Sequence, residues 1–189
     1  MTDAIETLRR REGLIFLLGF ALCIPAANWL ILHLGTTCVP NGPCLIPVAP
    51  NLMAPSGVVM VGLALVLRDL VQRRLGIKIA AAGILFGALL SAFFAPKALV
   101  LASAAAFLMS ETADLLVYTP LQKKGLMLAV IASSGVGLVI DSVIFLALAF
   151  GSLAFLEGQV IGKAWMVLLS LPAIAWLRRR DERLGLTPA

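Results

Sequence analysis

The stretch LMLAVIASSGVGLVIDSVIFLALAFG, residues 126–151, decides the fold class of this 189-residue chain. It is longer than the roughly 20 apolar residues that a helix needs to cross the hydrocarbon core of a bilayer. Its one ionisable residue is Asp141. Lipid offers no hydrogen-bond partner to the backbone, so a continuous apolar run of this length crosses as a helix. The stretch therefore predicts a membrane-spanning helix.

Similar apolar stretches precede and follow it. We predict six spans, near residues 14–34, 55–75, 77–95, 97–120, 126–151 and 159–177. With 61% hydrophobic residues, 13% charged residues and a mean hydropathy of +1.03, the chain is more apolar than a soluble domain of its length. This excludes a soluble enzyme, a disordered chain and a disulfide scaffold. We expect an all-α polytopic membrane protein in which residues 1–189 form a single transmembrane domain, a bundle of six transmembrane helices.

The basic residues are distributed unevenly between the two ends of the predicted spans. Loops rich in Lys and Arg stay on the cytoplasmic side of a membrane, so both termini are predicted to be cytoplasmic. The same distribution explains the net charge of +5 without a nucleic-acid partner. The first span has the basic flank of a signal peptide, but its length favours an uncleaved helix. The basic residues predicted at the cytoplasmic end, thirteen of the 15, are Arg9, Arg10, Arg11, Arg68, Arg73, Arg74, Lys78, Lys123, Lys124, Arg178, Arg179, Arg180 and Arg183.

The loop after the first span, residues 35–54, carries four prolines and no charge, which predicts an irregular extracytoplasmic segment. Cys38 and Cys44 lie in this loop, where a small disulfide loop and two free thiols are both open interpretations. The chain has a single histidine, His33, and no Cys-x-x-Cys or His-Glu-x-x-His spacing. We therefore expect neither a metal site nor a cofactor.

Several polar and ionisable residues lie inside the predicted spans. An ionisable side chain is costly at bilayer depth unless it is paired, so each one is a candidate functional residue. Glu111 has no basic neighbour in the sequence, which makes it our best candidate for contact with a ligand. The complete set is Asn28, Asp69, Glu111, Asp114, Asp141 and Lys163.

Each charged member of this set also has a structural interpretation, which the sequence leaves open. Asp69 could form an ion pair with Arg68, Arg73 or Arg74 that anchors a helix end at the membrane interface. Asp114 could be anchored by the basic turn that follows the fourth span. Asp141 and Lys163 could join the fifth and sixth spans, although an apolar pair would join them at lower cost.

Short segments in five of the six predicted spans resemble one known family, the VUT family. Its members are six-helix proteins of the bacterial inner membrane that take up queuosine precursors, the 7-deazaguanines. The resemblance implies a multi-pass, non-enzymatic transporter for a compound such as 7-cyano-7-deazaguanine. The segments are LRDLVQRRLG (residues 67–76), SETADLLVY (110–118) and GLVIDSVIF (137–145), with Asn28-Trp29 in the first span and Gly162-Lys163 in the last.

The chemistry of such a substrate suggests roles for the buried polar residues. A 7-deazaguanine presents a ring N–H and an exocyclic amine, and one carboxylate, Glu111 or Asp141, can accept both. Asn28 and a hydroxyl such as that of Ser134 would bind the substrate carbonyl, while Lys163 would neutralise the other carboxylate or contact the substrate itself. The aromatic candidates for stacking on the ring are Trp29, Phe107, Tyr118 and Phe145. The secondary polar candidates are Asp69 and Asp114.

Two uptake mechanisms remain open at this point. A buried carboxylate that carries a proton would make the chain a secondary transporter. The alternative is the substrate-binding membrane component of an ATPase-driven vitamin or nucleobase uptake system, because the chain has no nucleotide-binding motif of its own. An intramembrane enzyme is disfavoured because no nucleophile is paired with His33, and the buried charges argue against a purely structural role. The expected partners are a purine-like small molecule and the lipid bilayer, and a homo-oligomer stays open.

Overall fold

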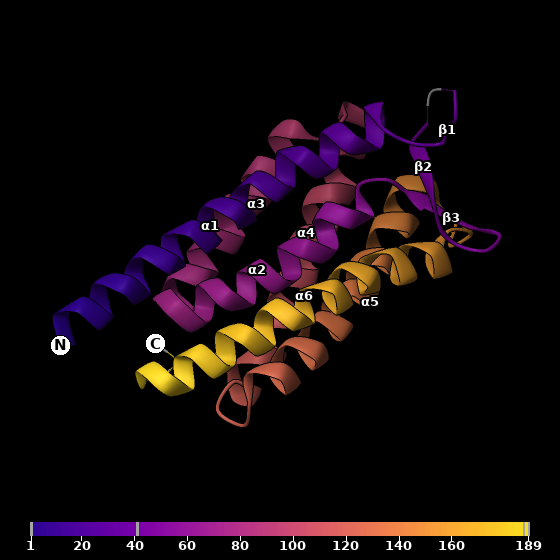
Figure 1. Ribbon diagram of the computed structural model, residues 1–189. Coiled ribbons are helices and arrows are strands. Elements are labelled where there is room, and N and C mark those ends of the chain that lie inside the picture. Colours follow the sequence, from indigo (N-terminus) through magenta and orange to yellow (C-terminus); the bar gives the residue numbers. More distant parts are fainter. Residues whose placement is uncertain (1, 41, 187, 189) are drawn as a thin grey trace.

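The computed structural model describes residues 2–40, 42–186 and 188, and it consists mainly of α-helices (Figure 1). The N-terminal and C-terminal ends lie at one end of the bundle, and three short strands lie at the other (Figure 1). We refer to these as the terminal end and the sheet end. The α-helices of the described ranges are α1 (Thr2–His33), α2 (Val58–Leu75), α3 (Ile77–Phe94), α4 (Val100–Leu121), α5 (Leu126–Phe150) and α6 (Leu156–Leu184), and a 3-10 turn, η1 (Lys97–Leu99), precedes α4.

The helices correspond to the predicted spans. Helices α2 to α5 begin and end within three residues of the predicted limits, whereas α1 begins earlier and α6 ends later. In the described ranges, five helices are long and apolar enough to cross a membrane, and α2 is the exception. Its second half carries Arg68, Asp69, Arg73 and Arg74, which lower its hydropathy.

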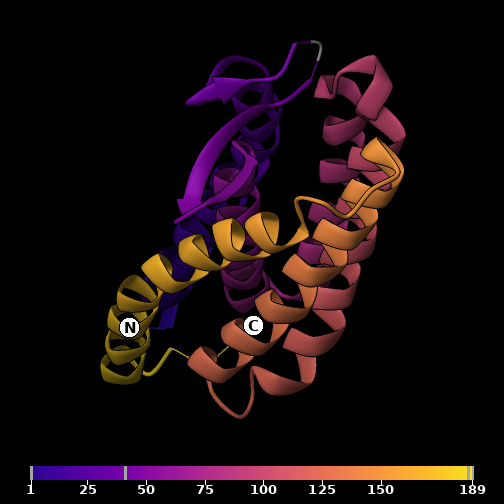
Figure 2. The same ribbon diagram turned by 90° about the vertical axis from the view of Figure 1, so that its right-hand side faces the viewer.

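Helix α2 is surrounded by protein. It contacts each of the other five α-helices of the described chain. Figure 2 shows that α6 begins beside α5 and then crosses the bundle to the side of α1 and α2. All four charged residues of α2 are buried. Their charges therefore face other side chains rather than lipid. The helix can cross a membrane inside the bundle even though its own sequence is less apolar than that of the other helices.

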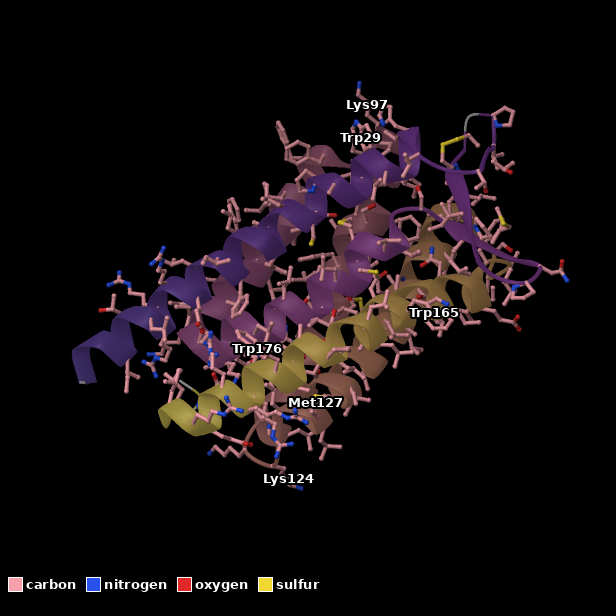
Figure 3. The ribbon with its side chains drawn as sticks, viewed as in Figure 1. Trp29, Lys97, Lys124, Met127, Trp165 and Trp176 are labelled. Atoms are coloured by element: carbon pink, nitrogen blue, oxygen red, sulfur yellow. A yellow bond between two sulfur atoms is a disulfide. The ribbon has the colours of Figure 1, made fainter. Side chains whose placement is uncertain are left out.

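The distribution of polarity is the reverse of that in a soluble protein. Leu89, Phe93 and Leu101 are 69%, 81% and 74% exposed, while Arg68 and Asp114 are fully buried. An apolar surface of this extent requires a lipid environment. Lys97 and Lys124 flank α4, and Figure 3 places them at opposite ends of the bundle.

We predicted an irregular loop between α1 and α2, and this was wrong. The segment forms a three-stranded antiparallel sheet in the order β1-β2-β3. The strands are β1 (Thr37–Cys38), β2 (Cys44–Ala49) and β3 (Leu52–Pro55). Prolines suggested an irregular loop because they cannot donate to a strand ladder. In β2, however, Pro47 lies past the end of the two-residue β1, where one edge of the strand is open. The turn into β3 places Asn51 at φ 60°, a left-handed conformation that Asn tolerates.

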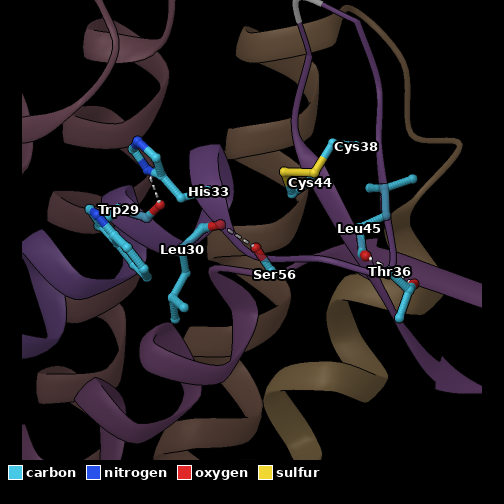
Figure 4. Close-up of a disulfide and its surroundings, with 8 residues drawn as sticks. All are labelled: Trp29, Leu30, His33, Thr36, Cys38, Cys44, Leu45 and Ser56. Atoms are coloured by element: carbon cyan, nitrogen blue, oxygen red, sulfur yellow. Dashed lines mark hydrogen bonds between the residues drawn. A yellow bond between two sulfur atoms is a disulfide. The ribbon is translucent and has the colours of Figure 1, made fainter.

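A disulfide joins the two cysteines of this segment (Figure 4). Cys38 and Cys44 are directly opposite each other in the β1–β2 pairing, so the structure selects the disulfide from the two interpretations that the sequence left open. The third cysteine, Cys23, is free and buried in α1.

The sheet is attached to helices on two sides of the bundle. On the α1 side, the hydroxyl of Ser56 donates to the carbonyl of Leu30 at 2.7 Å (Figure 4). On the α6 side, Nε1 of Trp165 donates to the carbonyl of Val48 at 2.9 Å. Gly158 allows α6 to approach the backbone of Met53 so closely that a side chain would collide with it.

Close packing of α2 against α6 generates the first prediction. A Cβ atom at Gly62 would lie 2.6 Å from the carbonyl oxygen of Lys163, so Gly62→Leu forces the two helices apart. We expect a loss of about 1–3 kcal/mol in the free energy of unfolding, seen as a lower thermal midpoint of the purified protein in detergent. Gly135→Leu is the control, because a Cβ there meets no atom within 4 Å. Equal midpoints for the two variants would contradict this account of the packing.

Candidate functional site

A cavity of about 750 Å³, its open mouth included, lies among the helices toward the sheet end. It is bounded by the last turns of α1 and the first turns of α2 and α6, with residues of α4 and α5 in its wall. Its wall is mainly apolar and includes the rings of Phe107 and Phe145. The polar side chains in the wall are those of Asn28, Ser91, Ser103, Ser110, Glu111, Asp141, Gln159 and Lys163.

Some of these polar groups have free hydrogen-bonding capacity. Oε2 of Glu111 accepts a hydrogen bond from Nε of Arg68 at 3.3 Å, while its Oε1 has no partner in the described part of the chain. The Nδ2 group of Asn28 donates to the carbonyl of Ile24 at 3.0 Å, which leaves its Oδ1 free. The hydroxyl of Ser103 also lacks a partner among the described residues. The cavity can therefore offer hydrogen bonds to a bound molecule.

Lys163 and Asp141 form a buried ion pair in the cavity wall. Nζ of Lys163 donates to Oδ2 of Asp141 at 2.6 Å, to Oγ of Ser142 at 2.8 Å and to Oε1 of Gln159 at 2.7 Å. An ammonium group has three N–H donors, so all of them are used. Oδ1 of Asp141 faces the hydroxyl of Ser110 at 3.5 Å. The cavity wall has two carboxylates, and Lys163 neutralises that of Asp141.

Behind the cavity wall, Arg68 of α2 is surrounded by three carboxylates. Its guanidinium contacts Oε2 of Glu111 at 3.3 Å and Oδ1 of Asp69 at 3.1 Å, and it also contacts Oδ1 of Asp114. Nη1 of Arg68 donates to Oε1 of Gln72 at 2.9 Å, one helical turn further along α2. All these side chains are at most 2% exposed. We refer to Arg68, Asp69, Glu111 and Asp114 as the arginine cluster.

The predicted site residues divide into two groups. Asn28, Glu111, Asp141 and Lys163 line one cavity, as do the aromatic candidates Phe107 and Phe145. The other predicted residues are outside the lining. Asp69 and Asp114 lie in the arginine cluster, and the centre of the Tyr118 ring lies 5.7 Å from the guanidinium carbon of Arg68. Ser134 is fully buried, whereas Trp29 is 55% exposed and stacks on His33 (Figure 4).

The structure adds to two interpretations of the second and fourth spans. Asp69 does pair with Arg68, but both side chains are fully buried and Arg68 also contacts Glu111 and Asp114. Asp114 is likewise held by Arg68 rather than by the basic turn after α4. Sequence adjacency suggested the anchors, but the partners that bury Arg68 come from α4, more than 40 residues away.

Gln72 and Gln159 were missed by the sequence analysis, although a signal for both is present. Each lies four residues from a buried cation on the same helix, Gln72 after Arg68 and Gln159 before Lys163. Residues four apart share a helix face, so an amide at this spacing is a candidate acceptor for the cation. Both amides are fully or nearly fully buried and accept hydrogen bonds from their cations.

A second ion network lies at the terminal end of the bundle. Asp181 of α6 accepts hydrogen bonds from Arg73 and Arg74 of α2 at 2.7–3.0 Å. Glu12 of α1 joins Arg74 at 2.9 Å and also contacts Arg180. These pairs hold α1, α2 and α6 together on the side of the arginine cluster away from the sheet.

In the described part of the chain, no group of His, Cys, Asp and Glu side chains is arranged to hold a metal ion. The cavity wall and the arginine cluster therefore offer hydrogen bonds and charge, which are the interactions needed to bind and release a polar organic molecule.

Comparison with known proteins gives one family match. Residues 94–177 match the model of a family described as "Putative vitamin uptake transporter". The matched region contains Glu111, Asp114, Asp141 and Lys163, and it begins at the last residue of α3. No curated protein and no solved structure matches the chain. The match and the membrane-helical fold indicate a multi-pass, non-enzymatic membrane transporter of small molecules.

The buried pair in the cavity wall generates the second prediction. Lys163→Met leaves the Asp141 carboxylate without its cation, and we expect this to lower the free energy of unfolding by about 3–5 kcal/mol. The double variant with Asp141→Leu should recover part of this loss, because both charges are then gone. Unfolding by SDS of the purified protein in mixed micelles measures both values. Lys97→Met, at an exposed site, is the control, and an equal loss in it would contradict the pairing.

Proposed function

We propose that this chain imports a 7-deazaguanine, a queuosine precursor such as 7-cyano-7-deazaguanine, across the bacterial cytoplasmic membrane. In this proposal its six helices all span the membrane as a single domain, with both termini in the cytoplasm. The family match supports the transporter class, the resemblance of the motif segments supports the substrate class, and the uneven distribution of basic residues supports the orientation.

The observation that carries the proposal is the free Oε1 of Glu111 in a cavity with apolar and aromatic walls. An ionised carboxylate only accepts hydrogen bonds, and each of its oxygens has two lone pairs. The free Oε1 can therefore accept from the ring N–H or the exocyclic amine of a guanine-like edge, while Oε2 stays bound to Arg68. Arg68 fixes the orientation of the Glu111 side chain by binding Oε2 from behind the wall.

The remaining wall supplies groups that suit the rest of a deazaguanine. Phe107 and Phe145 offer aromatic surfaces for a flat ring system. Asn28 and Ser103 have unused donor capacity for the substrate carbonyl. Lys163 has no donor left, so we assign it to neutralising Asp141 rather than to contacting the substrate.

The position of the cavity is consistent with import. It lies toward the sheet end, whereas a separate polar hollow lined by Arg73, Lys123 and Asp181 lies at the terminal end. With the termini in the cytoplasm, the sheet end is the extracytoplasmic end, so the cavity lies on the side from which an imported substrate arrives.

The third prediction tests the substrate and its carboxylate together. Purified protein should bind 7-cyano-7-deazaguanine, 7-aminomethyl-7-deazaguanine or queuine in a calorimetric titration. Glu111→Gln should weaken that binding about tenfold to a hundredfold, because a charge-assisted hydrogen bond contributes about 1.5–3 kcal/mol. The glutamine keeps the size of the side chain and an acceptor for Arg68, so the fold should be retained.

The exposed Glu157 provides the matched control, and Glu157→Gln should bind like the unaltered protein. Absence of binding to all three compounds would overturn the proposed substrate class. Uptake by proteoliposomes that contain only this chain would support a secondary transporter. Binding without such uptake, restored by an ATPase partner, would favour an ATPase-driven system.

A further inference from the structure

The arginine cluster contains more negative than positive charge. Arg68 contributes one positive charge, whereas Asp69, Glu111 and Asp114 contribute three negative charges when all are ionised. These side chains are at most 2% exposed. Unbalanced charge is very costly in a buried, membrane-embedded site, so the cluster needs an additional positive species.

No neighbouring element supplies a second free cation in the described chain. From α6, Lys163 is engaged by Asp141 of α5, and Arg73 of α2 is engaged by Asp181. The nearest other titratable groups are the thiol of Cys23 on α1 and the phenol of Tyr118 on α4. Neither carries a positive charge in any protonation state. The charge of the cluster is therefore left to a mobile ion.

Two buried carboxylate oxygens of the cluster have no hydrogen-bond partner. They are Oδ2 of Asp114 and Oδ1 of Asp69, the latter 3.1 Å from Nη2 of Arg68. The same Nη2 atom contacts both carboxyl groups, so the two lie side by side. Two carboxylates that share a site cannot both ionise easily, and one proton between them satisfies a donor and an acceptor at once.

We propose that Asp69 and Asp114 form a proton-binding site that is linked to the substrate cavity through Arg68 and Glu111. The proposal rests on the transport function proposed above. A proton fits better than a metal ion, because no described group of carboxylates, His and Cys has the geometry of a metal site. The hydroxyl of Ser133 donates to Oδ2 of Asp69 at 2.8 Å, and Arg68 contacts Oδ1 of Asp69 and Oδ1 of Asp114, so Oδ2 of Asp114 is the oxygen left for the proton.

The linkage follows from competition for one guanidinium. With the proton bound, the pair carries a single negative charge, and Arg68 can bind it and Glu111 together. When the proton leaves, the pair carries two negative charges and draws Arg68 away from Glu111, whose 3.3 Å contact is the longest of the three. Glu111 then stands unpaired in the cavity wall and holds its ligand differently. Proton and substrate thus bind cooperatively, and an inward proton gradient drives uptake.

The test uses the full chain in proteoliposomes with labelled 7-cyano-7-deazaguanine. An inward gradient of one pH unit should support accumulation up to about tenfold for one proton per substrate, and an internal pH dye should report proton entry that depends on substrate. Asp114→Asn removes the shared site, so it should keep substrate binding and substrate exchange but lose accumulation. Asp114→Glu should restore accumulation, and Glu157→Gln should behave as the unaltered chain.

A second measurement requires no variant. Calorimetric titration of the unaltered protein in two buffers of different ionisation enthalpy should show that substrate binding takes up protons. Equal heats in the two buffers, accumulation that ignores the pH gradient, or accumulation driven by a sodium gradient at equal pH would each overturn the proton site. Failure of the proposed substrate is distinguishable, because the unaltered chain would then show no binding in either buffer.

Discussion

The structure depends on the neutralisation of Arg68 in the interior of the bundle. A guanidinium cannot lose its proton in a protein, so its charge must be met wherever the helix places it. Here α4 supplies Glu111 and Asp114, α2 itself supplies Asp69, and Gln72 takes a further donor. These contacts fix the rotation of α2 relative to α4. The helix with the least suitable composition for lipid therefore occupies the place with the most protein contacts.

The cavity and the arginine cluster are adjacent and share one residue. Glu111 belongs to both, with one oxygen bound to Arg68 and the other in the cavity. The Lys163–Asp141 pair forms a separate, self-contained part of the wall, since its charges cancel. This division explains how a membrane protein can hold six ionisable side chains at depth: four share one cluster, and two neutralise each other.

Apolar runs predicted most helix limits correctly, because the length of lipid to be crossed constrains the sequence directly. Four of the six polar residues singled out from the sequence line one cavity, and Lys163–Asp141 had been considered as a pair. Arg68 was counted with the basic residues of the cytoplasmic end because Arg73 and Arg74 follow it closely, whereas its partners Glu111 and Asp114 are distant in the chain. The sheet was missed because prolines weigh against strands locally, and only the short length of β1 shows why Pro47 is tolerated.

The small sheet connects two helices that bound the cavity. Ser56 bonds it to α1, and Trp165 bonds it to α6, while the disulfide between Cys38 and Cys44 ties its first two strands together. A strap of this kind limits how far the rims of the cavity can separate. Movements that admit or release a small molecule must therefore occur mainly by tilting of the helices beneath the strap, with the rim at the sheet end as the pivot.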